Sequence, residues 1–141
     1  MKAIIVDRKI NVAVVGCGRI SQNHLDAIQK NTDNLHLVAL CDVDEMVLKE
    51  KCDEFDVAGY ISLEEMLLAE HIDLVILATP SGMHAPQAIA CAELGVHVLT
   101  EKPMATTWKD GLAMVNKFNS SSAELFVVKQ NRNNPTLRLL K

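Results

Sequence analysis

Residues 10–21 read Ile10-Asn11-Val12-Ala13-Val14-Val15-Gly16-Cys17-Gly18-Arg19-Ile20-Ser21, and this stretch decides the fold. The first six residues are mostly apolar and β-branched, which predicts a buried strand that ends at Gly16. A helical pattern over about residues 20–29 follows, with Leu25 and Ile28 on one face. A strand joined to a helix by a glycine-rich turn is typical of a loop that binds phosphate groups.

The same alternation of strand and helix continues along the chain. Apolar runs predict further strands at 35–41, 60–61, 73–79, 96–100 and 125–128. Apolar residues at helical spacing predict helices over about 44–55, 62–69, 83–94 and 107–119. Strands that are apolar throughout and alternate with helices indicate an α/β fold with a doubly wound parallel sheet.

Local signals mark several helix ends. Ser62 and Glu65 have the spacing of a capping box at a helix start, and Gly95 suits a left-handed helix end. Trp108, Leu112 and Val115 recur at helical spacing and indicate the last helix.

Composition excludes several function classes. The 141 residues are 49% hydrophobic and carry a formal net charge of −4, which indicates one globular domain without the basic surface of a nucleic-acid binder. The longest strongly apolar run, residues 74–78, is far too short to span a membrane, so no membrane partner is expected. The first seven residues also lack the apolar length of a signal peptide.

Cysteine spacing agrees with a reducing compartment. Cys17, Cys41, Cys52 and Cys91 show no CxxC pattern, and we interpret them as buried, reduced thiols. His24, His36, His71 and His97 show no metal-binding spacing, and we interpret them as structural or exposed. The sequence predicts no metal site and a cytoplasmic protein.

The two ends of the chain suggest three segments. We expect residues 1–9 to be an N-terminal extension or edge segment and residues 10–131 to be a dinucleotide-binding domain. Pro135, Leu137 and Leu140 indicate a helix that is just beginning. We therefore expect residues 132–141 to open a truncated C-terminal substrate domain, as in the first half of a longer protein.

The three small positions of the turn have separate roles. Gly16 permits the tight turn, and Gly18 lets the backbone approach a pyrophosphate without a Cβ in the way. The third position is usually Gly or Ala, and Ser21 is a mild departure. The free amides at the helix start would hold the pyrophosphate.

The second predicted strand ends at an acid. Asp42 lies 24 residues after Gly18, which matches the acid that binds the adenosine ribose hydroxyls in dinucleotide-binding folds. A carboxylate there repels a 2′-phosphate, and no Lys or Arg follows until Lys49, so NAD is favoured over NADP. Alternatively, Asp42 is a solvated turn residue or a helix cap, a role for which Asp44 is equally suited.

Two further motifs follow predicted strands. Thr79-Pro80-Ser81-Gly82-Met83-His84 follows the fourth strand, and Glu101-Lys102-Pro103 follows the fifth. Together with the glycine turn and Asp42, they resemble the Gfo/Idh/MocA oxidoreductase family over nearly the whole chain. The segments 128–132 and 134–136 are similar to one branch, the bacterial UDP-N-acetylglucosaminuronate 3-dehydrogenases of O-antigen sugar biosynthesis.

The resemblance implies a Rossmann domain that binds NAD and an enzyme that moves hydride between a sugar carbinol and nicotinamide. Lys102 would be the catalytic lysine and would accept or relay the hydroxyl proton. Pro103 often follows a cis peptide bond in the family. Substrate contacts are implied for Lys102, Asn131 and Arg132, although a surface role for Arg132 is also open. Cofactor contacts are implied for Gly16, Gly18, Arg19, Ile20, Asp42, Thr79, Pro80, Ser81, His84, Glu101 and Lys102. His84 has a second interpretation, because it can instead cap or pack at its helix start.

Alternatives remain at the level of function. The family's second catalytic pair, an Asp and a His on one helix, lies beyond this chain, so we expect little turnover from the chain alone. Family members are commonly homo-oligomers when full length. The substrate could instead be an inositol, glucose or another polyol. A non-catalytic NAD-sensing module and a complete single-domain NAD-binding module are the interpretations from other classes.

Overall fold

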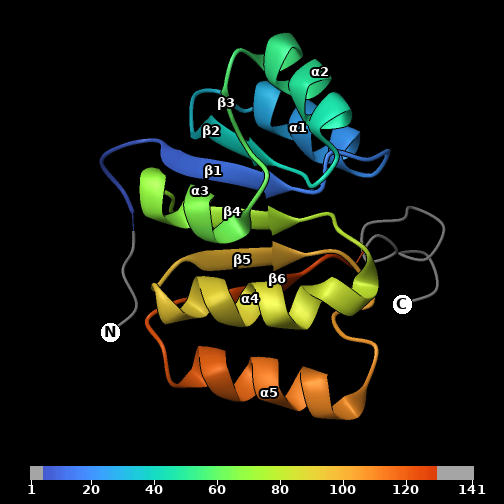
Figure 1. Cartoon of the computed structure of the whole chain (residues 1–141). Helices are drawn as coiled ribbons and strands as arrows, with labels where there is room; N and C mark the ends of the chain where they lie inside the picture. Colours follow the sequence, from blue (N-terminus) through green and yellow to red (C-terminus); the bar gives the residue numbers. More distant parts are fainter. Residues whose placement is uncertain (1–4, 130–141) are drawn as a thin grey trace, which may run out of the picture.

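The computed structural model describes residues 5–129, and a six-stranded parallel sheet lies at the centre of this part of the chain (Figure 1). The strand order is β3-β2-β1-β4-β5-β6. Their bounds are β1 Ile10–Val15, β2 Leu35–Cys41, β3 Ala58–Tyr60, β4 Leu74–Leu77, β5 His97–Thr100 and β6 Leu125–Val127. The order reverses between β1 and β4, which is where open α/β sheets bind ligands at the carboxyl ends of their strands.

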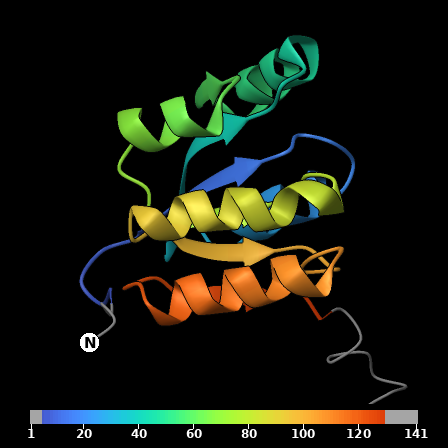
Figure 2. The same ribbon diagram turned by 60° about the horizontal axis from the view of Figure 1, so that its bottom comes forward.

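Helices cover both faces of the sheet, which confirms the doubly wound fold (Figures 1 and 2). α1 (Ser21–Gln29) and α2 (Glu45–Phe55) lie on one face. The other face carries α3 (Leu63–Ala69), α4 (His84–Glu93) and α5 (Trp108–Asn119). A short 3-10 turn, Ser81–Met83, leads into α4. In residues 5–129 every helix is too short or too polar to pass through a bilayer.

Alternate residues of each central strand enter different hydrophobic cores. Val12 and Val14 of β1 pack with Leu25 and Leu48 under α1 and α2. Ala13 and Val15 point the other way, into the core under α3, α4 and α5. Because side chains alternate across a strand, a strand covered on both faces is apolar at every position. This explains why β1 shows no polar alternation.

Side-chain caps fix several helix starts. Asp44 accepts hydrogen bonds from the amides of Met46 and Val47, and Ser62 accepts one from the amide of Glu65. Gly95 has a φ of +75°, which confirms the predicted left-handed helix end. Strand β3 lies about two residues earlier than the sequence pattern predicts.

The structure confirms the last predicted helix as α5. The three residues whose spacing indicated it, Trp108, Leu112 and Val115, face outward, and Trp108 is 85% exposed. Met114 and Phe118 form the buried face of this helix instead. A helix with two apolar stripes buries the one that meets the sheet and α4, and spacing alone does not distinguish the two stripes.

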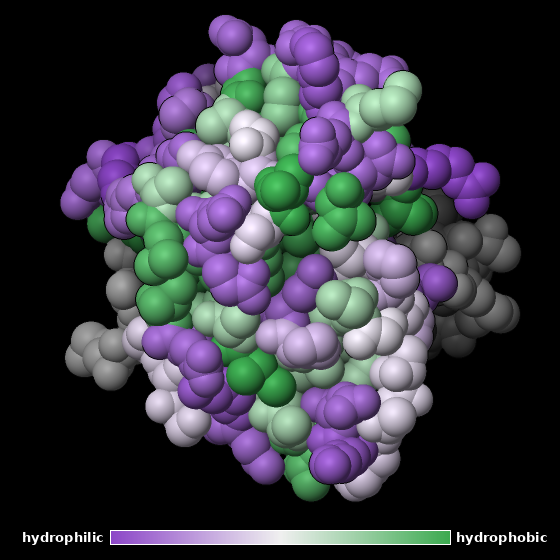
Figure 3. All heavy atoms as spheres, in the orientation of Figure 1, coloured by the Kyte–Doolittle hydropathy of each residue, from purple (hydrophilic) through white to green (hydrophobic). Residues whose placement is uncertain are grey.

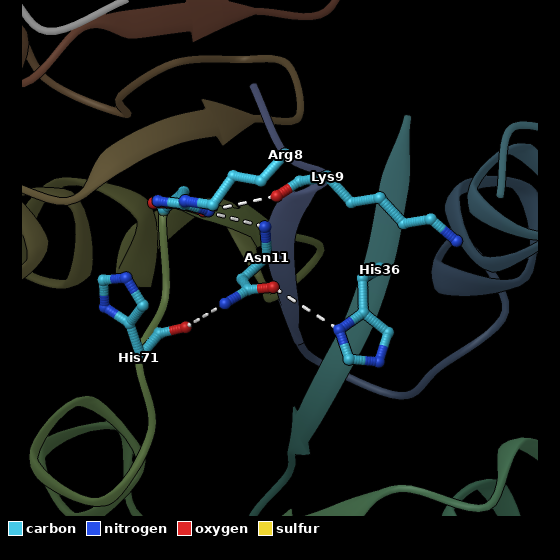
Figure 4. A network of polar contacts seen from close by, with 6 residues as sticks. Arg8, Lys9, Asn11, His36 and His71 are labelled. Atoms are coloured by element: carbon cyan, nitrogen blue, oxygen red, sulfur yellow. Dashed lines mark hydrogen bonds and ion pairs between the residues drawn. The ribbon is translucent and has the colours of Figure 1, made fainter. Parts of the chain in front are cut away.

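A polar network joins the amino ends of β1 and β4 to the segment before β1 (Figure 4). Arg8 donates two hydrogen bonds to the carboxylate of Asp73, at 2.6 and 2.7 Å. The amide of Asn11 donates to the same carboxylate at 2.8 Å, and its side chain donates to the carbonyl of His71. Asp73 is only 8% exposed. The bonds from Arg8 lower the pKa of Asp73 below its ordinary value, although burial acts in the opposite direction.

We expect Arg8→Met to lower the thermal midpoint at neutral pH by about 5 °C, because it removes the charged partner of the nearly buried Asp73 carboxylate and leaves it only the amide of Asn11 among the described residues. A lowered pKa stabilises the fold above the unfolded-state pKa of 3.8 and loses its effect as the pH falls through the folded-state value. The difference between variant and wild type should therefore shrink below pH 3.8. Melting curves between neutral and acidic pH measure this.

Lys9→Met is the matched control, because the Lys9 side chain points away from the network (Figure 4). Equal midpoints for the wild-type chain and Arg8→Met at neutral pH would contradict the proposed role of the network.

Candidate functional site

A cavity of about 970 Å³ opens at the carboxyl ends of β1, β2 and β4. It lies at the point where the strand order reverses. In the space-filling view, hydrophobic residues gather between the region of α2 and the region of α4 (Figure 3). The predicted site residues that line the cavity are Gly16, Gly18, Arg19, Ile20, Asp42, Thr79 and Pro80.

The two glycines of the turn meet very different surroundings. Gly16 has a φ of +91°, and a Cβ on it would lie 2.8 Å from the carbonyl carbon and oxygen of Ala78. The packing of β1 against β4 therefore requires glycine at this position. A Cβ on Gly18 would meet nothing within 4 Å. The protein itself does not need a glycine there, so the open space at Gly18 is room for a ligand.

The start of α1 leaves backbone amides available to that ligand. Ser21 is fully buried, and its hydroxyl donates to the carbonyl of Gly18 at 2.6 Å. Within residues 5–129, the amides of Gly18, Arg19 and Ile20 donate to no protein group. Helix α1 also has no side-chain cap. Unpaired amides at a helix start attract anions such as phosphate groups.

Asp42 faces the glycine turn. Its Oδ2 accepts a hydrogen bond from the amide of Cys17 at 2.6 Å, and its Oδ1 accepts one from the amide of Asp44 at 2.9 Å. Asp44 is the cap of α2, so the capping alternative for Asp42 is not what the structure shows. The carboxylate is thus held at the cavity rim beside the unpaired amides.

The thiol of Cys17 lies inside the turn but is buried. Burial, with Asp42 as a further cause, raises its pKa to about 12, and burial raises the pKa of Cys41 to about 11. Protonated thiols are poor nucleophiles, so these residues fill space. All four cysteines are free, but Cys52 is only partly buried, which corrects the expectation of four buried thiols.

The loop after β4 is held from within the protein. Thr79 donates from its hydroxyl to Gln87 at 2.6 Å. His84 is 1% exposed, and its ring nitrogens lie 2.8 Å from the carbonyl oxygen of Thr79 and 2.9 Å from that of Pro103. This favours the packing interpretation of His84. Neither His84 nor Ser81 lines the cavity.

The loop after β5 carries the predicted catalytic lysine. Lys102 is exposed, and no group in the described part of the chain forms a hydrogen bond or ion pair with its ammonium. The Lys102–Pro103 peptide bond is cis, as the family resemblance implies. Glu101 lies 2.8 Å from Nε2 of His24, and both side chains are mostly buried. Asn131 and Arg132, the expected substrate contacts, lie outside the described residues.

Sequence reasoning missed an apolar part of the cavity wall. Val43, Ile61 and Met83 line the cavity, and Val43 is 87% exposed. Val43 directly follows Asp42, and Ile61 directly precedes the Ser62 cap. An apolar residue between the end of a strand and the cap of the next helix was the sequence signal that could have predicted this part of the cavity wall.

The fold and this site define a Rossmann-type domain, and comparison with known proteins agrees. The Gfo/Idh/MocA family model, described as an oxidoreductase family with an NAD-binding Rossmann fold, matches residues 10–129. The chain belongs to this family.

Solved structures and a curated relative extend the comparison. The chain is 51% identical to the WlbA dehydrogenase of Chromobacterium violaceum, solved with NADH and UDP-GlcNAcA, with a TM-score of 0.96 over 100% of this chain and 41% of that one. The WlbA dehydrogenase of Bordetella pertussis, solved with the same two ligands, gives 47% identity and a TM-score of 0.94 over 97% of this chain and 40% of that one. A 4-carboxy-2-hydroxymuconate-6-semialdehyde dehydrogenase from Sphingobium is 33% identical over 90% of this chain and 40% of that protein. The chain thus spans about two fifths of the length of these proteins.

The two turn glycines should respond differently to substitution. We expect Gly16→Ala to destabilise the fold by about 3 kcal/mol or more, because the new Cβ meets the backbone of Ala78 and φ is positive. Gly18→Ala should change stability by less than about 0.5 kcal/mol. Urea unfolding of both variants measures the difference, and equal losses would contradict the assignment of Gly16 to packing and Gly18 to ligand access.

Proposed function

We propose that this chain is the NAD-binding domain of an oxidoreductase that acts on a sugar carbinol. One observation carries the proposal. Three backbone amides, at Gly18, Arg19 and Ile20, have no partner within residues 5–129 and lie at the same cavity rim as the carboxylate of Asp42. An anion-binding helix start beside a ribose-binding acid fits a dinucleotide. The NADH complexes of the two WlbA dehydrogenases support the same cofactor.

Different residues of the cavity would bind the pyrophosphate, the adenosine ribose and the adenine of NAD. The amides of the turn would hold the pyrophosphate, and the Arg19 side chain at the cavity wall would add a positive charge nearby. Asp42 would accept hydrogen bonds from the adenosine ribose. The exposed apolar side chains of Val43 and Ile61 lie next to this acid in the cavity wall and would contact the adenine.

The reacting end would lie at the loops after β4 and β5. When bound, NAD supplies the hydride acceptor at this end. Lys102 follows β5, and within the described part of the chain its side-chain nitrogen contacts no other group, so it can approach the substrate hydroxyl. In its neutral amine form it would receive the hydroxyl proton or relay it. Thr79, Pro80, Ser81 and Glu101 would border the nicotinamide side.

We propose UDP-N-acetylglucosaminuronate as the substrate, oxidised at C3, in O-antigen sugar biosynthesis. Support comes from the identity of about half with two dehydrogenases that were solved with UDP-GlcNAcA. Asn131 and Arg132 would contact the substrate, since a guanidinium pairs well with a carboxylate or diphosphate.

We also propose that residues 10–131 work with a further substrate half that begins near residue 132, since the relatives are more than twice as long. Residues 1–9 would then be an extension before the domain. Cytoplasmic location is supported by the unpaired cysteines. The longer protein would be a homo-oligomer, as family members commonly are.

Asp42 should set the choice between NADH and NADPH. We expect the chain to bind NADH at least about a hundredfold more tightly than NADPH, because a carboxylate repels the 2′-phosphate. Asp42→Asn should weaken NADH binding about tenfold and narrow the gap. Fluorescence titration with both nucleotides measures this. Asp44→Ser is the control, because it removes a charge two residues away but retains a capping side chain. A preference unchanged by Asp42→Asn would refute the assignment.

Lys102 should matter for turnover and not for cofactor affinity. In a protein that joins this domain to a substrate half, we expect Lys102→Met to lower kcat by a factor of about 100 to 10,000, the range of general acid–base catalysis. The affinity for NADH should stay within about threefold. Steady-state rates with UDP-GlcNAcA and NADH titration measure the two effects. A rate close to that of the wild type would remove Lys102 from the mechanism.

A further inference from the structure

Two histidines contact the Glu101-Lys102-Pro103 segment from opposite faces of the sheet. His24 belongs to α1, and His84 is the first residue of α4. These helices cover different faces (Figure 1). His24 reaches Glu101, one residue before the lysine, and His84 reaches Pro103, one residue after it.

The contact of His24 is a side-chain pair. Its Nε2 lies 2.8 Å from Oε1 of Glu101, and the two side chains are 13% and 17% exposed. Without His24, the mostly buried carboxylate of Glu101 would keep one weak contact within residues 5–129, the 3.4 Å bond from the amide of Lys102. Burying a carboxylate costs free energy unless a hydrogen-bond donor compensates for the lost water. The contact with His24 therefore fixes the position of the Glu101 side chain.

The contact of His84 is with the backbone. Its ring bridges the carbonyl oxygens of Thr79 and Pro103, which belong to the loops after β4 and β5. Carbonyl oxygens only accept hydrogen bonds. A neutral imidazole donates to one of them and the charged ring donates to both. The ring is 1% exposed, so water does not compete for these contacts.

We propose that His24 and His84 are positioning residues that hold the Glu101-Lys102-Pro103 segment in place for the reacting half of the cofactor. The His24 side chain is 13% exposed and His84 is 1% exposed, and their ring contacts go to protein groups, so both act on the cofactor through the segment. The inference rests on the proposed function, because it assumes that this segment borders the nicotinamide. From the sequence, His24 is interpreted as structural or exposed, and His84 has two interpretations; both now have a positioning role.

Pairs of substitutions separate the effect of the hydrogen bond from the effect of side-chain size. His24→Gln keeps a donor near the place of Nε2, whereas His24→Leu removes it. His84→Asn places its amide nitrogen near the former Nδ1 and so offers a donor to the carbonyl of Pro103. His84→Gln places its nitrogen near the former Nε2 and offers a donor only to the carbonyl of Thr79.

The test compares NADH with ADP-ribose, which lacks the nicotinamide half, on the 141-residue chain and its variants. We expect His24→Leu and His84→Gln to weaken NADH binding about tenfold and to leave ADP-ribose within about twofold. His24→Gln and His84→Asn should bind NADH within about threefold of the wild-type chain. Melting midpoints show which variants are folded. Because His24 is more exposed than His84, the comparison of His24→Leu with His24→Gln can still be made if a His84 variant unfolds.

Three results would overturn the inference. One is unchanged NADH binding in His24→Leu and His84→Gln. Another is an equal loss for NADH and ADP-ribose, which indicates a general structural role. The third is a lack of rescue by His24→Gln and His84→Asn. A wild-type chain that binds neither nucleotide would instead refute the proposed function.

Discussion

The bond from the amide of Cys17 to the carboxylate of Asp42 is the constraint on which the site depends. At 2.6 Å it joins the turn after β1 to the end of β2. Because the same carboxylate also accepts from the amide of Asp44, its orientation is fixed by two backbone donors. This arrangement turns one amide of the glycine loop inward, and within residues 5–129 the following three amides have no protein partner. Amides of the kind that attract anions thus lie beside an acidic group.

Side chains extend this constraint to the other loops of the sheet edge. His84 links the loop after β4 to the loop after β5, and His24 links the loop after β5 back to α1, the helix that begins at the glycine turn. Hydrogen bonds therefore connect the loop after β4 to the loop after β5, and the loop after β5 to α1. At the opposite edge of the sheet, Arg8 and Asp73 connect the amino ends of β1 and β4. The site is built on a sheet that is held at both ends.

Local features of the sequence predicted most of this architecture. The sequence pointed to Gly16 as the turn glycine and to Asp42 as the acid at the end of the second strand, because this combination at this spacing is typical of dinucleotide-binding α/β folds. Strand and helix order followed from apolar runs and caps.

Contacts between distant residues could not be predicted in this way. His24 and Glu101 are separated by 77 positions, and only the folded sheet brings them together. The outward face of Trp108 likewise depends on which stripe of α5 meets α4, which is a property of packing. Asn131 and Arg132 lie outside the described residues and stay predictions.

The most direct test is a nuclear magnetic resonance titration of the isotope-labelled chain with NAD. We expect the largest amide shifts at Gly18, Arg19 and Ile20, with further shifts around Asp42. Amides in the polar network at Arg8 should not shift. Shifts that centre on α5 while the glycine turn stays unchanged would show that NAD does not bind at the glycine turn.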